Sequence, residues 1–467
     1  MAFLVIHGHF YQPPRENPWT GEVEPEPGAA PYHDWNERIH AESYAPNADN
    51  YKNISFNFGP TLFSWLARHH PDTYQKILAA DKESIARRGG HGNAIAQAYG
   101  HAILPLCNER DRLTQVIWGL ADFRFRFGRE AESLWLPETA ANDQVLALLI
   151  ERGLRYVILA PNQAKVEVDS SKAYVFRHPD GSGRSLSVFF YNGQLARAIA
   201  FEKALTSSRG LVEHFIRAAG SGELLNIATD GETYGHHFKF GDLCLAHALE
   251  VEAPEAGFRI TNYGEYLDRH PAEIEVEIDN GPDGEGTSWS CVHGVGRWTR
   301  DCGCHTGGEP GCNQSWRTPL REALNFLRDD TAVKFENAGG EVLRDPWAAR
   351  NDYVDVILDH RALDAFLNGH ALRPDESRIV QLMEMQRIAL LMFASCGWFF
   401  SDVAGIETIQ VMRYAARVMD LQHQLGFDPP EKQFLEILAA AKSNDPEKGN
   451  GADLFLRFAT PRERNDW

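Results

Sequence analysis

The chain has few cysteines, a shortage of basic residues and no long apolar run, and each shortage excludes a class of protein. Its seven cysteines are an odd number in 467 residues, which is typical of reduced thiols and not of a disulfide framework. Lys and Arg number 46 against 65 Asp and Glu, a net charge of -19. Because nucleic acids and anionic membranes attract basic surfaces, we expect neither as a partner.

The longest clearly apolar runs, such as residues 388–394, are far too short to span a bilayer. The amino-terminal segment has no basic leader, so it predicts a buried first strand and not a signal peptide, and we expect a cytoplasmic location. Phosphate-loop, dinucleotide and serine-elbow motifs are missing, which argues against nucleotide-binding and serine-hydrolase functions. A neutral ligand such as a sugar suits this acidic chain with 11 Trp.

The first 265 or so residues alternate short apolar runs with amphipathic stretches such as 142–152 and 209–219. Strand candidates are residues 3–6, 133–136, 156–159, 186–191, 225–228 and 258–261. Apolar strands alternating with helices predict an α/β fold in which helices cover a parallel sheet.

Two further regions follow this alternating part. A segment rich in Gly, Cys and Trp occupies residues 276–318, and loops of this length are usually functional. Beyond it the apolar spacing is helical, at 320–328, 353–358, 378–394 and 406–424. We therefore expect a catalytic domain at 1–275, an active-site loop segment at 276–318 and a helical domain at 319–467.

Two carboxylates stand at the ends of strand candidates. Glu138 follows Trp135-Leu136-Pro137, and the proline must stop the strand there. Asp230 ends a second apolar run and is followed by Gly and then Glu232. Two carboxylates on separate strand ends are what glycoside cleavage requires, one to attack the sugar and one to protonate the leaving oxygen. The alternative is that each acid only caps the following helix.

Histidines accompany these acids. His7 and His9 alternate along the first strand, so both side chains point to one face. Hydrogen bonding to substrate, metal ligation and simple core packing are all compatible with this pattern. His101 stands before another strand-to-loop transition.

These segments together resemble glycoside hydrolase family 57, which covers α-amylase-like, branching and 4-α-glucanotransferase enzymes. The resemblance rests on four motifs in order, listed with their residues: His9 and Gln12-Pro13; His101 and Leu104-Pro105-Leu106; Trp135-Leu136-Pro137-Glu138; Asp230, Glu232 and Gly235-His236. A fifth, helical motif is approximated by Ser395 to Asp402, with Trp398 inside it, and Asn93 stands where the family usually carries an acid. The Cys- and Trp-rich segment resembles a poorly characterised subgroup of the same family.

The resemblance implies an incomplete (β/α)7 barrel followed by an all-α domain, and a retaining mechanism without a cofactor or catalytic metal. Glu138 would be the nucleophile and Asp230 the general acid/base, acting on an α-1,4/α-1,6-glucan or a related oligosaccharide by hydrolysis or transfer. The remaining substrate-binding candidates are His7, His9, Gln12, His101, Trp135, Glu232, His236, Trp289, Trp298, Trp398 and Asp402. For the tryptophans, core packing is the alternative to stacking on sugar rings.

Cys291, Cys302, Cys304 and Cys312 could bind zinc together with nearby histidines. Ten, one and seven residues separate them, however, which is not the spacing of paired zinc knuckles. We interpret them as packing thiols of a loop and keep metal binding as the alternative. Two rival functions also stay open: a metal-dependent carbohydrate hydrolase or deacetylase, and a glucan-binding protein without turnover.

Overall fold

In the computed structural model, which describes residues 2–461, the chain forms two compact units. The first comprises the residues up to Pro14, Glu24–Tyr99 and Asp122–Trp289. The second comprises Arg15–Val23, Gly100–Ala121 and the chain from Ser290 onward. The expected loop segment at 276–318 is thus divided at Trp289, and two short excursions of the chain leave the first unit for the second.

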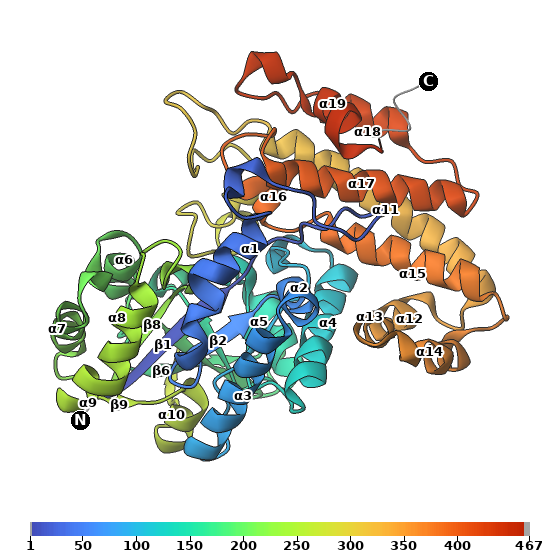
Figure 1. Ribbon diagram of the computed structural model, residues 1–467. Helices are drawn as coiled ribbons and strands as arrows, with labels where there is room; N and C mark the ends of the chain where they lie inside the picture. Colours follow the sequence, from blue (N-terminus) through green and yellow to red (C-terminus); the bar gives the residue numbers. More distant parts are fainter. Residues whose placement is uncertain (1, 462–467) are drawn as a thin grey trace. The chain divides into compact units, whose positions relative to one another are not determined.

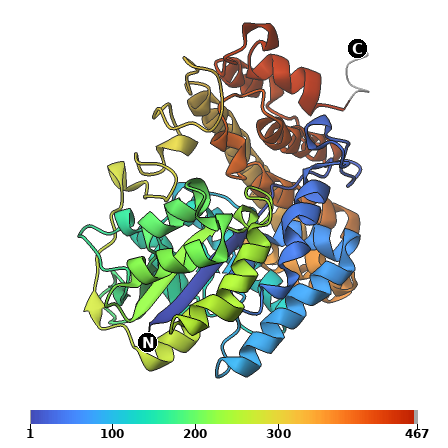
Figure 2. The same cartoon turned by 60° about the vertical axis from the view of Figure 1, so that its left-hand side comes forward.

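A ring of parallel strands forms the core of the first unit, in the spatial order β8-β1-β2-β3-β4-β5-β7. The strands are β1 (Phe3–Phe10), β2 (Ser55–Phe58), β3 (Ala96–Gln97), β4 (Leu134–Trp135), β5 (Tyr156–Leu159), β7 (Ser185–Phe190) and β8 (Leu224–Asp230). Isolated bridges join β2 to β3, at Phe56 and Ala94, and β4 to β5, at Ser133 and Tyr156. Figures 1 and 2 show β1 and β8 side by side.

The ring is not closed by a strand ladder between β7 and β8. A backbone hydrogen bond of 2.8 Å from Asn192 N to Asn226 O joins them instead. The outer edge of β7 pairs with antiparallel β6 (Ala173–Arg177), and β6 pairs with β10 (Ile274–Glu275). The short β9 (Arg259–Ile260) pairs with the start of β1. This arrangement confirms the expected incomplete (β/α)7 barrel.

Helices follow the strands, and three of those in this unit begin at an asparagine that caps the first turn. Asn142, Asn192 and Asn262 each accept a hydrogen bond from a first-turn amide, at 2.9–3.0 Å, which stabilises a helix start. The helices of this unit are α1 (Trp35–Ile39), α2 (Pro60–His69), α3 (Pro71–Arg87), α5 (Asp143–Glu151), α6 (Gly193–Phe201), α7 (Ser208–Ala219), α8 (Gly241–His247), α9 (Ala253–Glu255) and α10 (Tyr263–Arg269). Helix α4 (Glu109–Phe127) has residues in both units.

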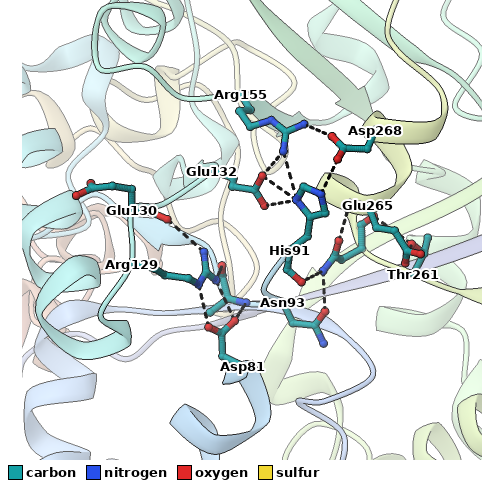
Figure 3. Close-up of polar contacts among 12 residues, drawn as sticks. Asp81, His91, Asn93, Arg129, Glu130, Glu132, Arg155, Thr261, Glu265 and Asp268 are labelled. Carbon is teal, nitrogen blue, oxygen red and sulfur yellow. Dashed lines mark hydrogen bonds and ion pairs between the residues drawn. The ribbon is translucent and has the colours of Figure 1, made fainter. Parts of the chain in front are cut away.

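The amino-terminal ends of β3, β4 and β5 are joined by ion pairs (Figure 3). His91 Nδ1 lies 3.0 Å from Glu132 Oε1, and its Nε2 lies 2.9 Å from Asp268 Oδ2 on α10. Arg155 also pairs with both carboxylates. In barrels of this kind the amino-terminal face serves stability and the carboxyl-terminal face carries the site.

Asn93 belongs to this stabilising face. Its side-chain amide donates to Tyr51 O at 2.9 Å, and its Oδ1 accepts from Asn262 Nδ2 at 3.1 Å. Asn93, which stands where the family usually carries an acid, therefore lies at the amino-terminal face of the barrel and not among the residues of the predicted site.

The second unit is helical, as expected for the carboxyl-terminal part. Its helices are α11 (Arg317–Val342), α12 (Pro346–Asp352), α13 (Val354–Leu358), α14 (Leu363–His370), α15 (Glu376–Leu391), α16 (Cys396–Phe399), α17 (Ile406–Gln424), α18 (Glu431–Leu438) and α19 (Gly451–Leu454). The long helices α11, α15 and α17 pack side by side. No helix formed by residues 2–461 has both the length and the apolar character that a membrane span needs.

Candidate active site

Polar and aromatic side chains form a layer across five consecutive barrel strands. The strand register places His9 opposite Asp230 on one side and opposite Asn57 on the other. It also pairs Gln97 with Trp135, and Asn57 Nδ2 donates to Gln97 Oε1 at 2.7 Å. The layer lies toward the carboxyl ends of these strands, where the sequence predicts the site. Asn57 and Gln97 are not among the predicted residues, although an Asn between two buried Phe residues is a signal.

Glu138 follows β4 in a tight turn, Pro137–Thr139, whose backbone is unusual. Its φ of 59° and ψ of 22° lie in the left-handed region, which is rare for a residue with a side chain and costs about 1–3 kcal/mol. Its carboxylate is half-buried and accepts a hydrogen bond from Trp289 Nε1, 2.9 Å from Oε2. The turn and this indole together fix the direction of the carboxylate.

Trp289 is placed by backbone pairing with the same turn. Thr287 and Ala141 exchange two backbone hydrogen bonds of 3.0 Å, and Trp289 N donates to Glu138 O at 3.1 Å. The indole ring also meets the edge of Trp135, with ring centroids 5.2 Å apart. The first part of the predicted loop segment thus lies against Glu138.

Asp230 is the last residue of β8 and stays accessible to solvent, although protein atoms surround it closely. These surroundings and the nearby charge of Glu138 raise the pKa of the Asp230 carboxyl group to about 7. Burial, and then the charge of Asp230, raise the pKa of Tyr191 at the end of β7. Tyr191 is not among the residues predicted for the site. The two predicted catalytic acids therefore share one electrostatic environment.

Glu232 is buried beside this pair. Its Oε1 accepts hydrogen bonds from Tyr44 OH at 2.7 Å and from Tyr11 N at 3.0 Å. Burial, with a contribution from the charge of Asp230, raises the pKa of Glu232 to about 8. Its carboxyl group is therefore neutral over much of the neutral pH range.

The glycines of this segment allow close packing. A side chain at Gly231 would lie 2.3 Å from the ring of Phe10. Gly235 has a φ of +122°, and a Cβ there would meet Glu42 O at 2.1 Å. The chain can therefore turn so that His236 Nδ1 makes a short contact with Glu42 Oε2.

His7 and His9 both stack on the buried ring of Trp135, with ring centroids 4.7 and 4.9 Å apart. His7 Nε2 and His9 Nδ1 contact the side-chain amide of Asn57 at 3.0 Å. Burial lowers the pKa of each to about 3, so both rings are neutral near pH 7. Gln12 is half-exposed, and its amide donates to Tyr11 O.

The structure places His101, Trp298, Trp398 and Asp402 in the second unit. Trp298 and Trp398 have no exposed surface, and their indole N–H groups donate to the backbone at Ser395 and Arg317. A fully buried ring has no face for a sugar, so the prediction of sugar stacking is wrong for these two tryptophans, which are core residues.

The other two residues in the second unit also have structural contacts. Asp402 accepts three hydrogen bonds, from Ala404 N, Ser443 Oγ and Asn444 N, and so joins two loops. His101 is buried, and its Nδ1 lies 2.7 Å from Ser395 Oγ. Its predicted contact with substrate stays a prediction.

The fold and the paired carboxylates define a barrel of the glycoside hydrolase type. Glycosyl hydrolase family 57 matches residues 32–279, more than half of the chain, and the protein belongs to this family. A domain of unknown function (DUF3536) matches residues 312–465.

Individual relatives are distant in sequence but similar in fold. An α-amylase of Pyrococcus horikoshii is 24% identical over 50% of this chain and 37% of its own length. A 4-α-glucanotransferase of Thermococcus litoralis is 22% identical over 46% of this chain and 32% of its own. The chain thus aligns with about a third of the length of these relatives.

Among solved structures, an exo-type maltose-forming amylase of Pyrococcus sp. ST04 has a TM-score of 0.72 at 15% identity, covering 99% of this chain and 93% of its own. A branching enzyme of Pyrococcus horikoshii has a TM-score of 0.63 at 15% identity, covering 94% of both chains. At this identity the likeness establishes the fold.

Proposed function

We propose that the protein is a retaining glycoside hydrolase or transglycosidase that acts on α-glucans, with Glu138 as nucleophile and Asp230 as general acid/base. Membership of family 57 supports this activity, as do its similarities to an α-amylase, a branching enzyme and a 4-α-glucanotransferase.

The observation that carries the proposal is the different environment of the two acids. The protein atoms around Asp230 and the charge of Glu138 raise its pKa to about 7, so a large fraction of this carboxyl group carries a proton near neutral pH. Glu138 accepts a hydrogen bond from Trp289, and its charge acts on Asp230. One protonated and one ionised carboxyl group are the starting state of this mechanism.

In the first step Glu138 attacks the anomeric carbon, while Asp230 gives its proton to the departing glycosidic oxygen. The product of this step is a glycosyl-enzyme ester on Glu138. In the second step the Asp230 carboxylate takes a proton from water or from a sugar hydroxyl, which displaces Glu138. Water gives hydrolysis, and an acceptor sugar gives transfer.

The other predicted site residues of the first unit fall into an accessible group and a buried group. Trp289, Gln12 and His236 keep accessible surface, and we assign them contacts with the sugar. The buried residues His7, His9, Trp135 and Glu232 position the accessible ones. Because the carboxyl group of Glu232 is neutral and hydrogen-bonded, it adds no second negative charge beside Asp230.

The deacetylase alternative finds no support in the arrangement of potential metal ligands. Within residues 2–461, two groups bring three or more His, Cys, Asp or Glu ligand atoms together, and neither includes His7, His9 or Asp230. A cytoplasmic location remains part of the proposal, supported by seven free thiols, since reducing compartments maintain such thiols.

The test is product analysis on maltoheptaose and amylose, with and without EDTA. The wild type is compared with Glu138→Gln and Asp230→Asn, and with Glu202→Gln as a matched control at an exposed carboxylate. We expect shorter or redistributed glucans from the wild type and the control only. Circular dichroism verifies that each variant is folded.

The proposal is wrong if the folded wild type leaves every α-glucan unchanged, or if either catalytic variant keeps full activity. A ladder of shorter products identifies hydrolysis. A mixture of shorter and longer chains identifies transfer.

A further inference from the structure

Four potential metal ligands lie close together in the second unit. None of them takes part in the proposed mechanism. Ligand atoms of Cys291, His293, Cys302 and Cys304 all lie within 4.8 Å of one another. All seven cysteines are free thiols. Three thiols and one imidazole are a ligand set that structural zinc sites use.

The distances within the cluster match those of a tetrahedral zinc site. Cys291 Sγ lies 3.8 Å from both Cys302 Sγ and Cys304 Sγ, and Cys304 Sγ lies 3.5 Å from His293 Nδ1. With Zn–S bonds of about 2.3 Å and Zn–N bonds of about 2.05 Å, a regular tetrahedron separates two sulfurs by about 3.8 Å and sulfur from nitrogen by about 3.6 Å. Disulfide-bonded sulfurs would be about 2.04 Å apart.

We propose that Cys291, His293, Cys302 and Cys304 bind one structural Zn²⁺ ion. The proposal does not rest on the glucan activity. It replaces the interpretation of these cysteines as simple packing thiols, and it excludes Cys312, which does not belong to the cluster among the described residues.

The charges around the cluster support a bound metal. Three thiolates and one Zn²⁺ ion carry a net charge of minus one, and a buried charge needs compensation. Arg317, which is fully buried, donates to Cys304 O at 2.7 Å, and the buried Arg297 donates to Ser290 O at 3.1 Å. Neither guanidinium group makes an ion pair with a carboxylate among the described residues. Two buried cations therefore stand beside a site that is anionic once zinc is bound.

The loop is also shaped to bring the ligands together. Gly296 packs so closely that a Cβ would lie 3.1 Å from Cys302 Cβ and 3.6 Å from His293 Cβ. Gly303, between two ligands, has a φ of +79°, a conformation that glycine adopts readily. His293 is exposed and Cys302 and Cys304 are half-buried, so a metal or a chelator can reach the cluster.

A zinc ion here would have a structural role. All four coordinating positions would be filled by protein, and a site closed in this way has no open position for water or substrate. It would fix the chain that begins two residues after Trp289, whose indole contacts Glu138.

The experiment measures metal in the full-length protein, expressed with added zinc and purified under reducing conditions without chelators. Elemental analysis by mass spectrometry should find about one zinc per chain. Cys291→Ser, Cys302→Ser and Cys304→Ser should each lose the metal, and His293→Ala should bind it more weakly. Cys312→Ser and Cys107→Ser are matched controls that should keep it.

A second measurement uses the wild type alone, so that it does not depend on folding of variants. After zinc is removed with a chelator, Co²⁺ is added to the protein. Thiolate-to-cobalt charge-transfer bands together with the intense visible absorption of tetrahedral Co²⁺ are expected, and added Zn²⁺ should abolish both.

The proposal is overturned if the wild type contains no zinc and gives no thiolate bands with Co²⁺. It is equally overturned if iron is the bound metal, if a disulfide joins two of the three cysteines, or if Cys312→Ser loses zinc as completely as Cys302→Ser.

Discussion

Replacing Glu232 by Gln should make the stability of the protein less sensitive to pH. Glu232 is 5% exposed, and the pKa of its carboxyl group in the folded protein is raised from 4.5 to about 8, by burial first and then by the charge of Asp230. The folded protein therefore favours the protonated, neutral form of Glu232. Gln is neutral at all pH values, and its side-chain oxygen can accept the same hydrogen bonds from Tyr44 and Tyr11.

The sign follows from the protons bound in each state. Below about pH 4.5 both the folded and the unfolded wild type hold the proton, so ionisation costs no stability. Between that pH and about 8 the unfolded chain releases the proton and the folded chain keeps it, which lowers the free energy of unfolding by about 1.4 kcal/mol per pH unit. From about pH 5 to pH 8 the wild type should lose about 4 kcal/mol relative to Glu232→Gln.

The assay is urea denaturation of the wild type and Glu232→Gln at several pH values across this range, followed by fluorescence and circular dichroism. The informative quantity is the difference between the two proteins, because other titrating groups largely cancel. Glu265→Gln is the control. Burial raises the pKa of Glu265, but the hydrogen bond from Thr261 and the charge of Arg259 outweigh burial and lower this pKa overall. The ionised carboxylate therefore stabilises the fold fully at any pH above the pKa of the unfolded chain. The difference in free energy of unfolding between Glu265→Gln and the wild type should thus stay constant across this range. A constant difference for Glu232→Gln as well would refute the raised pKa.

Three further outcomes are expected. The value of kcat/KM should fall above about pH 7 as Asp230 loses its proton, and a flat profile up to pH 9 would contradict its role as acid. Trp289→Phe removes the donor to Glu138 but keeps an aromatic ring; a hydrogen bond to a charged group is worth about 1.5–3 kcal/mol, so kcat should fall about tenfold to a hundredfold, and an unchanged kcat would show that the contact is dispensable. Trp298→Ala should destabilise the second unit by about 3–5 kcal/mol without changing KM, whereas a raised KM at unchanged stability would indicate contact with sugar.

The parts of the fold that could be predicted are those in which local pattern and burial agree. β5 is a continuous apolar run and β8 a mainly apolar one that is almost wholly buried, and the structure places both strands within a residue or two of the predicted bounds. The helix predicted at residues 406–424 has the same bounds as α17. β2 was missed because Ser-Phe-Asn-Phe has a polar residue on the layer that faces the site. β3 is only two residues long, and its pairing with β4 forms it where no local pattern does.

The site divides in the same way. The placement of Glu138 and Asp230 at strand ends could be predicted, because each stands at the end of an apolar run within a recognisable motif. Asn57 and Tyr191 could not be predicted, because their surroundings depend on which strands are neighbours. Asn57 lies beside His9 because β2 pairs with β1. The pKa of Tyr191, at the end of β7, is raised in part by the charge of Asp230. A single sequence does not encode which strands become neighbours.

The Cys- and Trp-rich loop is the part of the chain in which the sequence leaves most alternatives open, for one physical reason. A helix or strand has a period that separates buried from exposed positions, but a loop has none. For Trp298 the sequence therefore leaves both sugar stacking and core packing open, whereas the chain turns at Gly296–Trp298 and buries the ring. The same turn brings Cys302 back to Cys291 across ten intervening residues and leaves Cys312 outside the cluster. Spacing rules for zinc describe knuckles in which a short turn holds two ligands, and here only Cys302 and Cys304 are that close in sequence. Measuring zinc in Cys302→Ser and Cys312→Ser therefore tests the path of the loop as well as the metal, because the fold described here predicts that only Cys302→Ser loses zinc.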